Sequence, residues 1–115
     1  MPNPDRMNKI NELLSQELSL LIEEDGERLG MLAVVSIDTS RDLSRADVFM
    51  AGISGPITKE VQKILTSEAG RYRHDLGRKL NFRRIPEFVF HFEQDPDTYQ
   101  RLEATLAAID REQAA

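Results

Sequence analysis

A short basic segment, from Arg71 to Arg84, contains the residues of this chain best suited to chemistry. Six of its fourteen residues are arginine or lysine, and Asp75 is its only acid. The segment therefore carries a formal charge of +5, although the whole chain carries −5. Arginine side chains bind phosphate oxygens through paired hydrogen bonds, so we expect contact with a nucleic-acid backbone. The candidate residues are Arg71, Arg73, His74, Arg78, Lys79, Arg83 and Arg84.

The spacing of apolar residues predicts that most of this segment is a helix with one charged face. Tyr72, Leu76 and Leu80 recur every four residues and form a buried stripe. At about 100° per residue, Arg71 and Arg78 then lie on the opposite, solvent-facing side. Such a face is often only solvated, and the main alternative here is pairing with acidic residues near the chain ends. Residues 1–28 and 93–115 each carry a net charge of −4.

Glycines interrupt the pattern at positions that need an explanation. A helix is predicted from about Ile57, and Gly70 falls inside its apolar pattern. Because an interior glycine costs a helix about 1 kcal/mol relative to alanine, we interpret Gly70 as a kink or break between two helices. Residues 52–55, GISG, have the spacing of nucleic-acid-binding GxxG loops. They lie between a predicted strand and a predicted helix, so we interpret them as a turn.

The elements that position this segment are predicted from caps and periodicity. A first helix is expected from Pro4 to about Gly26, with an apolar face of leucine, isoleucine and methionine. Strands are expected at residues 31–38, 46–51 and 86–93, the first two antiparallel. A last helix is expected after Asp95. The order is α-β-β-α-α-β plus a C-terminal helix, which indicates an α+β fold with helices on one face of a small sheet.

Alternation within the strands predicts which side chains share a face. Ala33, Val35 and Ile37 are expected on one face of the first strand. Three phenylalanines share a face of the third strand, Phe88, Phe90 and Phe92. A phenylalanine row can stack on nucleic-acid bases. The chain has only two tyrosines and five phenylalanines, so we assign this row to the core.

Other kinds of site are disfavoured by composition. The chain has no cysteine and two histidines, and no motif of a phosphate loop, zinc peptidase or nucleophile elbow occurs. We therefore expect no metal, no cofactor, no small-molecule substrate and no enzymatic activity. No apolar run approaches the roughly 20 residues of a membrane span, and the N-terminus lacks a secretory signal. We expect a cytoplasmic protein that does not contact membranes.

Three parts of the sequence resemble the ribosome-binding factor A family. Residues 28–51, RLGMLAVVSIDTSRDLSRADVFMA, resemble its turn, first strand, connection and second strand. Residues 69–90, AGRYRHDLGRKLNFRRIPEFVF, resemble its kinked helix, basic exit and third strand. The first helix matches in position and length, so the resemblance covers about residues 4–95.

The resemblance implies a KH-like domain of type II, αββααβ, in which a helix–kink–helix replaces the GxxG loop. It implies that Gly70 is the kink glycine. It also implies that basic residues of the following helix face RNA, namely Arg73, Arg78 or Lys79, and Arg83. Two positions depart from the family pattern. Glu68 stands where the family has the kink alanine, and Asp25-Gly-Glu stands where it has Asp-Pro.

We therefore expect a KH-like RNA-binding domain at residues 1–95 and a helical extension at residues 96–115. The resemblance implies a monomer that binds immature small ribosomal subunits and their rRNA and assists late rRNA processing, notably at low temperature. The alternative is a KH-like protein–protein adaptor whose basic helix binds an acidic partner.

Overall fold

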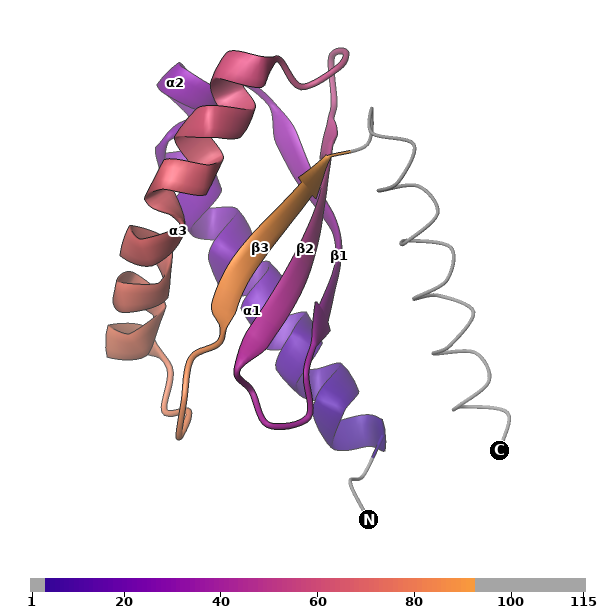
Figure 1. Ribbon diagram of the computed structural model, residues 1–115, viewed down its shortest axis with the longest axis vertical. Coiled ribbons are helices and arrows are strands. Elements are labelled where there is room, and N and C mark those ends of the chain that lie inside the picture. The colour runs from indigo at the N-terminus through magenta and orange to yellow at the C-terminus, as the bar shows by residue number, and fades with distance from the viewer. Residues whose placement is uncertain (1–3, 93–115) are drawn as a thin grey trace.

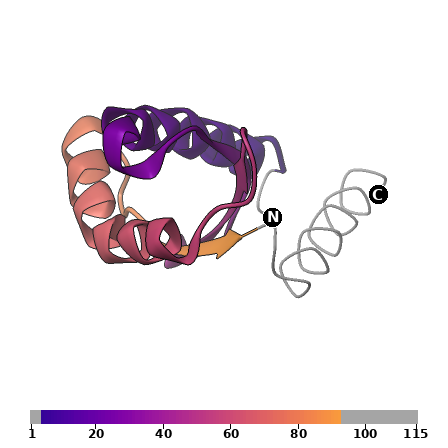
Figure 2. The same cartoon turned by 90° about the horizontal axis from the view of Figure 1, so that it is seen from above.

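The computed structural model describes residues 4–92, which form a three-stranded sheet and a layer of helices. Strand β1 pairs antiparallel with β2, and β2 pairs parallel with β3. The two long helices cover the same face of the sheet (Figures 1 and 2). The predicted α+β class is confirmed. The elements are α1 (Pro4–Glu24), α2 (Gly26–Leu29), β1 (Leu32–Thr39), β2 (Arg45–Gly52), α3 (Lys59–Lys79) and β3 (Glu87–Phe92).

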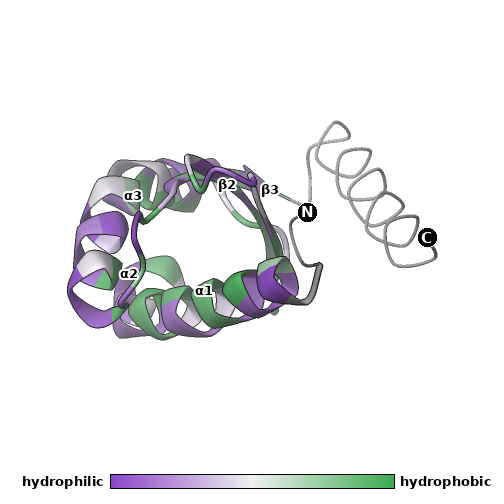
Figure 3. Cartoon of the chain, turned by 90° about the horizontal axis from the view of Figure 1, so that it is seen from below, coloured by the Kyte–Doolittle hydropathy of each residue, from purple (hydrophilic) through white to green (hydrophobic). Residues whose placement is uncertain are grey.

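The core lies between the helices and the sheet. Helix α1 carries both apolar and polar residues along its length, as in any helix with one buried face (Figure 3). Phe88 is buried, and Phe90 and Phe92 pack against the same cluster, so the core assignment of the phenylalanine row is confirmed. Side chains that are at most 1% exposed include Leu14, Leu18, Ala46, Val48, Met50, Leu65, Tyr72 and Leu76.

A bulge in β1 changes which side chains face the core. Val34 and Ser36 lie opposite consecutive residues of β2, so Val35 is an extra residue in the strand. A bulge of this kind shifts the alternation of side chains by one position. Val34 therefore packs against the core, whereas Val35 is 51% exposed. The prediction that Ala33, Val35 and Ile37 share a face is wrong, because strict alternation holds only in an unbroken strand.

Helix α3 runs without interruption from Lys59 to Lys79 and continues through Gly70. Of the two alternatives predicted at Gly70, a kink or a break between helices, the break is therefore wrong. Glycine is a poor helix former, but Leu65 before it and Tyr72 after it are buried in the same core, and this packing outweighs the propensity. The path of α3 changes direction near its middle (Figures 1 and 2). The assignment of a kink to Gly70 itself stays a prediction.

Residues 52–55 form a tight turn between β2 and α3, as predicted. A Cβ atom on Gly52 would lie 1.9 Å from the carbonyl oxygen of Gly55, so only glycine fits there. Gly55 has φ of +145°, a conformation that residues with side chains rarely adopt. Thr58 then caps α3 by accepting a hydrogen bond from the amide of Val61 at 3.2 Å. The steric demands of the turn explain both glycines.

The predicted C-terminal helix lies outside the described residues, and the domain boundary at residue 95 stays a prediction. Among the helices of residues 4–92, none is both long enough and apolar enough to cross a membrane. The first helix ends close to its predicted position, at Glu24, and is followed by the single turn of α2.

Truncation of a leucine on each side of α1 tests the assignment of its buried face. Leu18 is 0% exposed and Leu20 is 48% exposed. We expect Leu18→Ala to lower the free energy of unfolding by about 2–5 kcal/mol, because it removes buried methyl groups and leaves a cavity. Leu20→Ala should change it by no more than about 0.5 kcal/mol. Urea denaturation at neutral pH measures both, and equal losses would contradict the assignment.

Candidate nucleic-acid interface

The predicted binding residues all lie on the C-terminal half of α3 or in the loop that joins it to β3, and all are exposed. On the opposite side of the helix, Tyr72 and Leu76 are each 0% exposed. The predicted division of this segment into a buried face and a charged face is confirmed. Contact of the charged face with nucleic acid stays a prediction.

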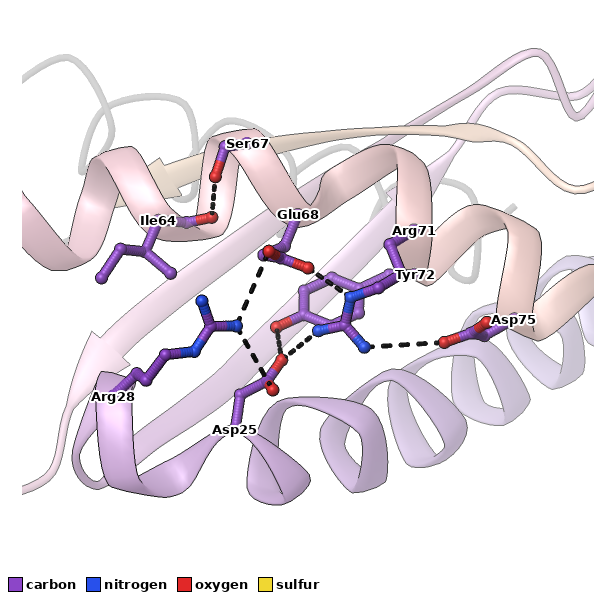
Figure 4. Close-up of polar contacts among 8 residues, drawn as sticks. All are labelled: Asp25, Arg28, Ile64, Ser67, Glu68, Arg71, Tyr72 and Asp75. Atoms are coloured by element: carbon purple, nitrogen blue, oxygen red, sulfur yellow. Dashed lines mark hydrogen bonds and ion pairs between the residues drawn. The ribbon is translucent and has the colours of Figure 1, made fainter.

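Arg71, the first residue of the set, lies among charged side chains from α3 and from the junction of α1 with α2 (Figure 4). Its guanidinium group donates hydrogen bonds to the carboxylates of Glu68 and Asp25 and lies 3.7 Å from Asp75. Arg28 of α2 also approaches Asp25 and Glu68, at 3.4 and 3.6 Å. We call this group the Asp25 cluster; its members are Asp25, Arg28, Glu68, Arg71, Tyr72 and Asp75.

Asp25 is the acceptor at the centre of this cluster. Its side chain is 16% exposed and accepts a hydrogen bond from the Tyr72 hydroxyl at 2.8 Å. Burial by itself raises the pKa of the carboxyl, but the hydrogen bonds from Tyr72 and Arg71 outweigh burial, so the pKa of Asp25 lies below its ordinary value. Burial, together with the bond to Asp25, raises the pKa of the Tyr72 phenol. Asp25 is therefore charged and Tyr72 neutral at physiological pH.

The cluster neutralises Arg71 within the protein. Its three carboxylates and two guanidinium groups sum to a net charge of −1. The hydrogen bond to Glu68 is the largest of the effects that raise the pKa of Arg71. A phosphate group would have to displace carboxylates in order to bind this side chain. Arg71 therefore pairs with acidic residues of its own chain, which is the alternative to phosphate binding that the sequence left open.

The Asp25 cluster joins two local ion pairs, one at the junction of α1 with α2 and one on α3. The spacing of three residues in Asp25–Arg28 and in Glu68–Arg71 is a sequence signal for each local ion pair. No sequence pattern indicates that the two pairs meet, because their contact depends on how α3 packs against the end of α1. Sequence reasoning therefore missed the cluster as a unit.

Four arginines beyond this cluster keep their charge available to a ligand. Among residues 4–92, no ion pair involves any of them. Arg73 is held by a hydrogen bond from its Nε to the carbonyl oxygen of Ile85 at 3.0 Å, which orients the guanidinium without neutralising it. Lys79 differs, because its Nζ lies 3.9 Å from Glu17 of α1. We call the four the basic end: Arg73, Arg78, Arg83 and Arg84.

The turn between β1 and β2 fixes the loop that carries part of the basic end. The backbone amide of Glu87 donates a hydrogen bond to the carbonyl oxygen of Ser44 at 3.0 Å. Within the turn, Asp42 accepts hydrogen bonds from the hydroxyls of Ser44 and Ser40 at 2.7 and 2.8 Å. These bonds, with a small contribution from the charge of Arg84, lower the pKa of Asp42 to about 2. The charged turn therefore lies close to the basic loop.

The two histidines occupy unrelated surroundings. His74 is exposed on α3, whereas His91 is 8% exposed in β3. The Nε2 atom of His91 lies 2.7 Å from a carboxylate oxygen of Asp47, and its ring stacks on Phe49 with centroids 5.0 Å apart. Within residues 4–92, no three residues of the histidine, aspartate and glutamate types are grouped so that they could hold a metal ion.

Replacement of Asp25 by asparagine tests the centre of the cluster. We expect Asp25→Asn to lower the free energy of unfolding at pH 7 by about 1–2 kcal/mol, because a neutral amide accepts weaker hydrogen bonds. The pKa of Asp25 is lower in the folded chain than in the unfolded chain. Its contribution is therefore present above the ordinary pKa of about 3.9 and is lost as the pH falls through the folded value.

The stability difference between the two proteins should accordingly shrink on acidification, measured by urea denaturation between pH 6 and pH 3. Glu24→Gln removes the same charge from the neighbouring, exposed residue and serves as the control. We expect it to change stability by less than about 0.5 kcal/mol. If the free energies of unfolding of Asp25→Asn and the unchanged protein differ by the same amount at every pH, the charge of the Asp25 carboxylate does not stabilise the fold.

Comparison with known proteins gives one consistent result. The family model of ribosome-binding factor A matches residues 6–106. Ribosome-binding factor A of Hahella chejuensis is 34% identical over 110 residues, which cover 88% of this chain and 82% of the relative. The protein of the same description from Alkalilimnicola ehrlichii is 32% identical over 117 residues, covering 94% of this chain and 88% of the relative.

Solved structures support the same assignment of the fold. The crystal structure of ribosome-binding factor A from Thermus thermophilus superposes with a TM-score of 0.66 at 22% identity, covering 74% of this chain and 92% of that one. Coordinates of the Thermus thermophilus protein fitted into a cryo-EM map of a complex with the 30S subunit superpose with a TM-score of 0.57 at 22% identity, covering 78% and 94%. The KH-like fold expected from the sequence is consistent with these neighbours. Because the family model spans most of the sequence and two relatives above 30% identity cover more than four fifths of it, this chain belongs to the ribosome-binding factor A family.

Proposed function

We propose that this protein binds the small ribosomal subunit by contacting rRNA phosphates with the basic end. The observation that carries the proposal is that four exposed arginines lie on the C-terminal half of α3 and in the following loop, and form no ion pair among residues 4–92. Family membership supports the same partner, because a Thermus thermophilus member has been fitted into a map of a 30S complex. His74 and Lys79 stay candidate contacts at the border of this surface.

The mechanism is binding rather than catalysis. Arginine–phosphate contacts position a protein on RNA, and the shape of a folded RNA selects the site. The Asp25 cluster holds α3 against α1, so the arginines are presented from a helix whose orientation is already set. The bound protein holds a local rRNA conformation in an immature subunit, assists late processing, and then leaves. We expect this activity to matter most at low temperature and to be exercised by a cytoplasmic monomer.

One observation favours a second candidate, a protein–protein adaptor whose basic helix binds an acidic partner. Arg71 already pairs with carboxylates of its own chain, which shows that guanidinium groups on this helix are placed well for acidic side chains. An acidic surface of another protein would then contact the basic end. The two candidates predict different partners for the same arginines.

Charge reversal at the basic end distinguishes them. We expect the double variant Arg78→Glu, Arg83→Glu to bind purified small subunits roughly a hundredfold more weakly in co-sedimentation, because each lost hydrogen bond to a charged group contributes about 1.5–3 kcal/mol. Lys59→Glu with Lys63→Glu makes the same charge change on the exposed first half of α3 and should cost no more than about threefold. Unchanged co-sedimentation of the first variant, with loss of a protein partner, would favour the adaptor.

The salt dependence of binding counts the phosphate contacts. Four contacts predict that the logarithm of the association constant falls with the logarithm of salt concentration with a slope of about −3. The double reversal should reduce the magnitude of that slope by about 1.5, since each phosphate contact accounts for about 0.7–0.9. Titrations between 50 and 200 mM salt measure both slopes. A flat dependence for the unchanged protein would rule out phosphate contacts as the source of affinity.

A further inference from the structure

A groove of about 460 Å³ lies between α3 and β3, a volume typical of ligand sites. From α3 it is lined by the small residues Ala69 and Gly70 and by Arg73; from β3 it is lined by residues 87–90. Successive side chains of a strand point to opposite faces of the sheet. A groove that touches four consecutive strand residues therefore runs along the edge of β3 that does not pair with β2.

This edge lacks the usual protection of an edge strand. Within the described chain, the sheet ends at β3, which pairs on one side with β2 through six consecutive residues and no irregularity. Its sequence, EFVFHF, contains no proline, lysine or arginine. The opposite edge, β1, carries the bulge at Val35, a device that hinders pairing with another strand. Strand β3 is therefore the edge suited to accept a further strand.

The helix side of the groove is open at Gly70. A Cβ atom placed on Gly70 would meet no atom within 4 Å, apart from its own helix backbone and chain neighbours. Gly70 is exposed, whereas the adjacent groove residue Phe88 is only 4% exposed. An apolar side chain of a ligand would fit in this space between α3 and β3. The glycine that weakens the helix thus leaves room beside the strand edge.

The charges in the groove distinguish between kinds of ligand. Among residues 4–92, the ionised residues that line it are Arg73 and Glu87, which have opposite signs. Both lie at the end where β3 begins, because Arg73 is bonded to the carbonyl oxygen of Ile85. A nucleic-acid strand would bring phosphates towards the Glu87 carboxylate. An uncharged peptide backbone avoids this repulsion, and an acidic side chain of a peptide would complement Arg73.

We propose that this groove binds an extended segment of another polypeptide, which pairs with β3 as a fourth strand. The segment places an apolar side chain beside Gly70 and an acidic side chain next to Arg73. Main-chain hydrogen bonds supply affinity in this mode, and the side chains seated in the groove supply specificity. The site goes beyond rRNA binding, since it uses the strand edge and the middle of α3 and shares only Arg73 with the basic end.

The test uses the whole chain and a defined probe. Peptides of twelve residues are selected from a phage-displayed random library, and the strongest binder is synthesised and titrated into isotope-labelled protein. We expect its binding to shift the amide resonances of residues 66–70 and 87–90. Gly70→Leu fills the groove and should raise the dissociation constant at least about tenfold. Gly70→Ala adds a single methyl group and should raise it by no more than about twofold.

Both substitutions favour helix over glycine, so the folded state should be retained, and thermal unfolding checks this. The variant Arg78→Glu, Arg83→Glu should bind the peptide as the unchanged protein does, which separates this site from the rRNA surface. The proposal is overturned if no selected peptide binds more tightly than millimolar, or if the shifted amides lie elsewhere. It is also overturned if octauridylate binds in the groove instead and Gly70→Leu blocks it. Self-association that Gly70→Leu abolishes would identify a second copy as the occupant and would equally overturn it.

Discussion

The hydrogen bond from the Tyr72 hydroxyl to Asp25 connects the hydrophobic core to the charged surface of α3. The ring of Tyr72 is fully buried, and its hydroxyl lies 2.8 Å from the carboxylate at the end of α1. A buried hydroxyl without an acceptor is costly, so core packing requires a partner at this position. Once Asp25 is there, its charge attracts guanidinium groups from α2 and α3. The orientation of α3 relative to α1 therefore depends on a polar contact made by a core residue.

This constraint divides the charges of α3 into two regions. Near Asp25, the carboxylates cancel the charge of Arg71, although the sequence places that residue first in the basic segment. Farther towards the C-terminus of α3 and in the following loop, the arginines of the basic end form no ion pair among residues 4–92. Cations at the C-terminus of a helix are favoured by its dipole, so their accumulation there does not destabilise α3. The charge anomaly of the sequence becomes a localised surface in the fold.

Glu68 shows how a charged side chain is accommodated in the middle of α3. A glutamate at the expected position of a small kink residue would disturb a closely packed helix bend. In this structure the side chain of Glu68 points to the Asp25 cluster, where it is bonded to Arg71 and lies close to Arg28 (Figure 4). Its hydrogen bond to Arg71 lowers the pKa of its carboxyl, which therefore stays charged. Glu68 adds an ion pair to the junction between α3 and the end of α1, and α3 continues past Glu68 without interruption.

Local spacing in the sequence was sufficient for the first helix, the three strands, the buried face of α3 and the turn at residues 52–55, because each depends on residues close together in the chain. The same patterns located the basic segment and its sign. They did not reveal the extra residue at Val35 or the continuity of α3 through Gly70, since strand pairing and core packing decide these features. Nor did they indicate that Arg71 is paired with Asp25, because Asp25 lies between α1 and α2 and is far from α3 in the sequence. Contacts between distant parts of the chain determine which of the predicted charges face a ligand, and this information exists only once the helices have packed.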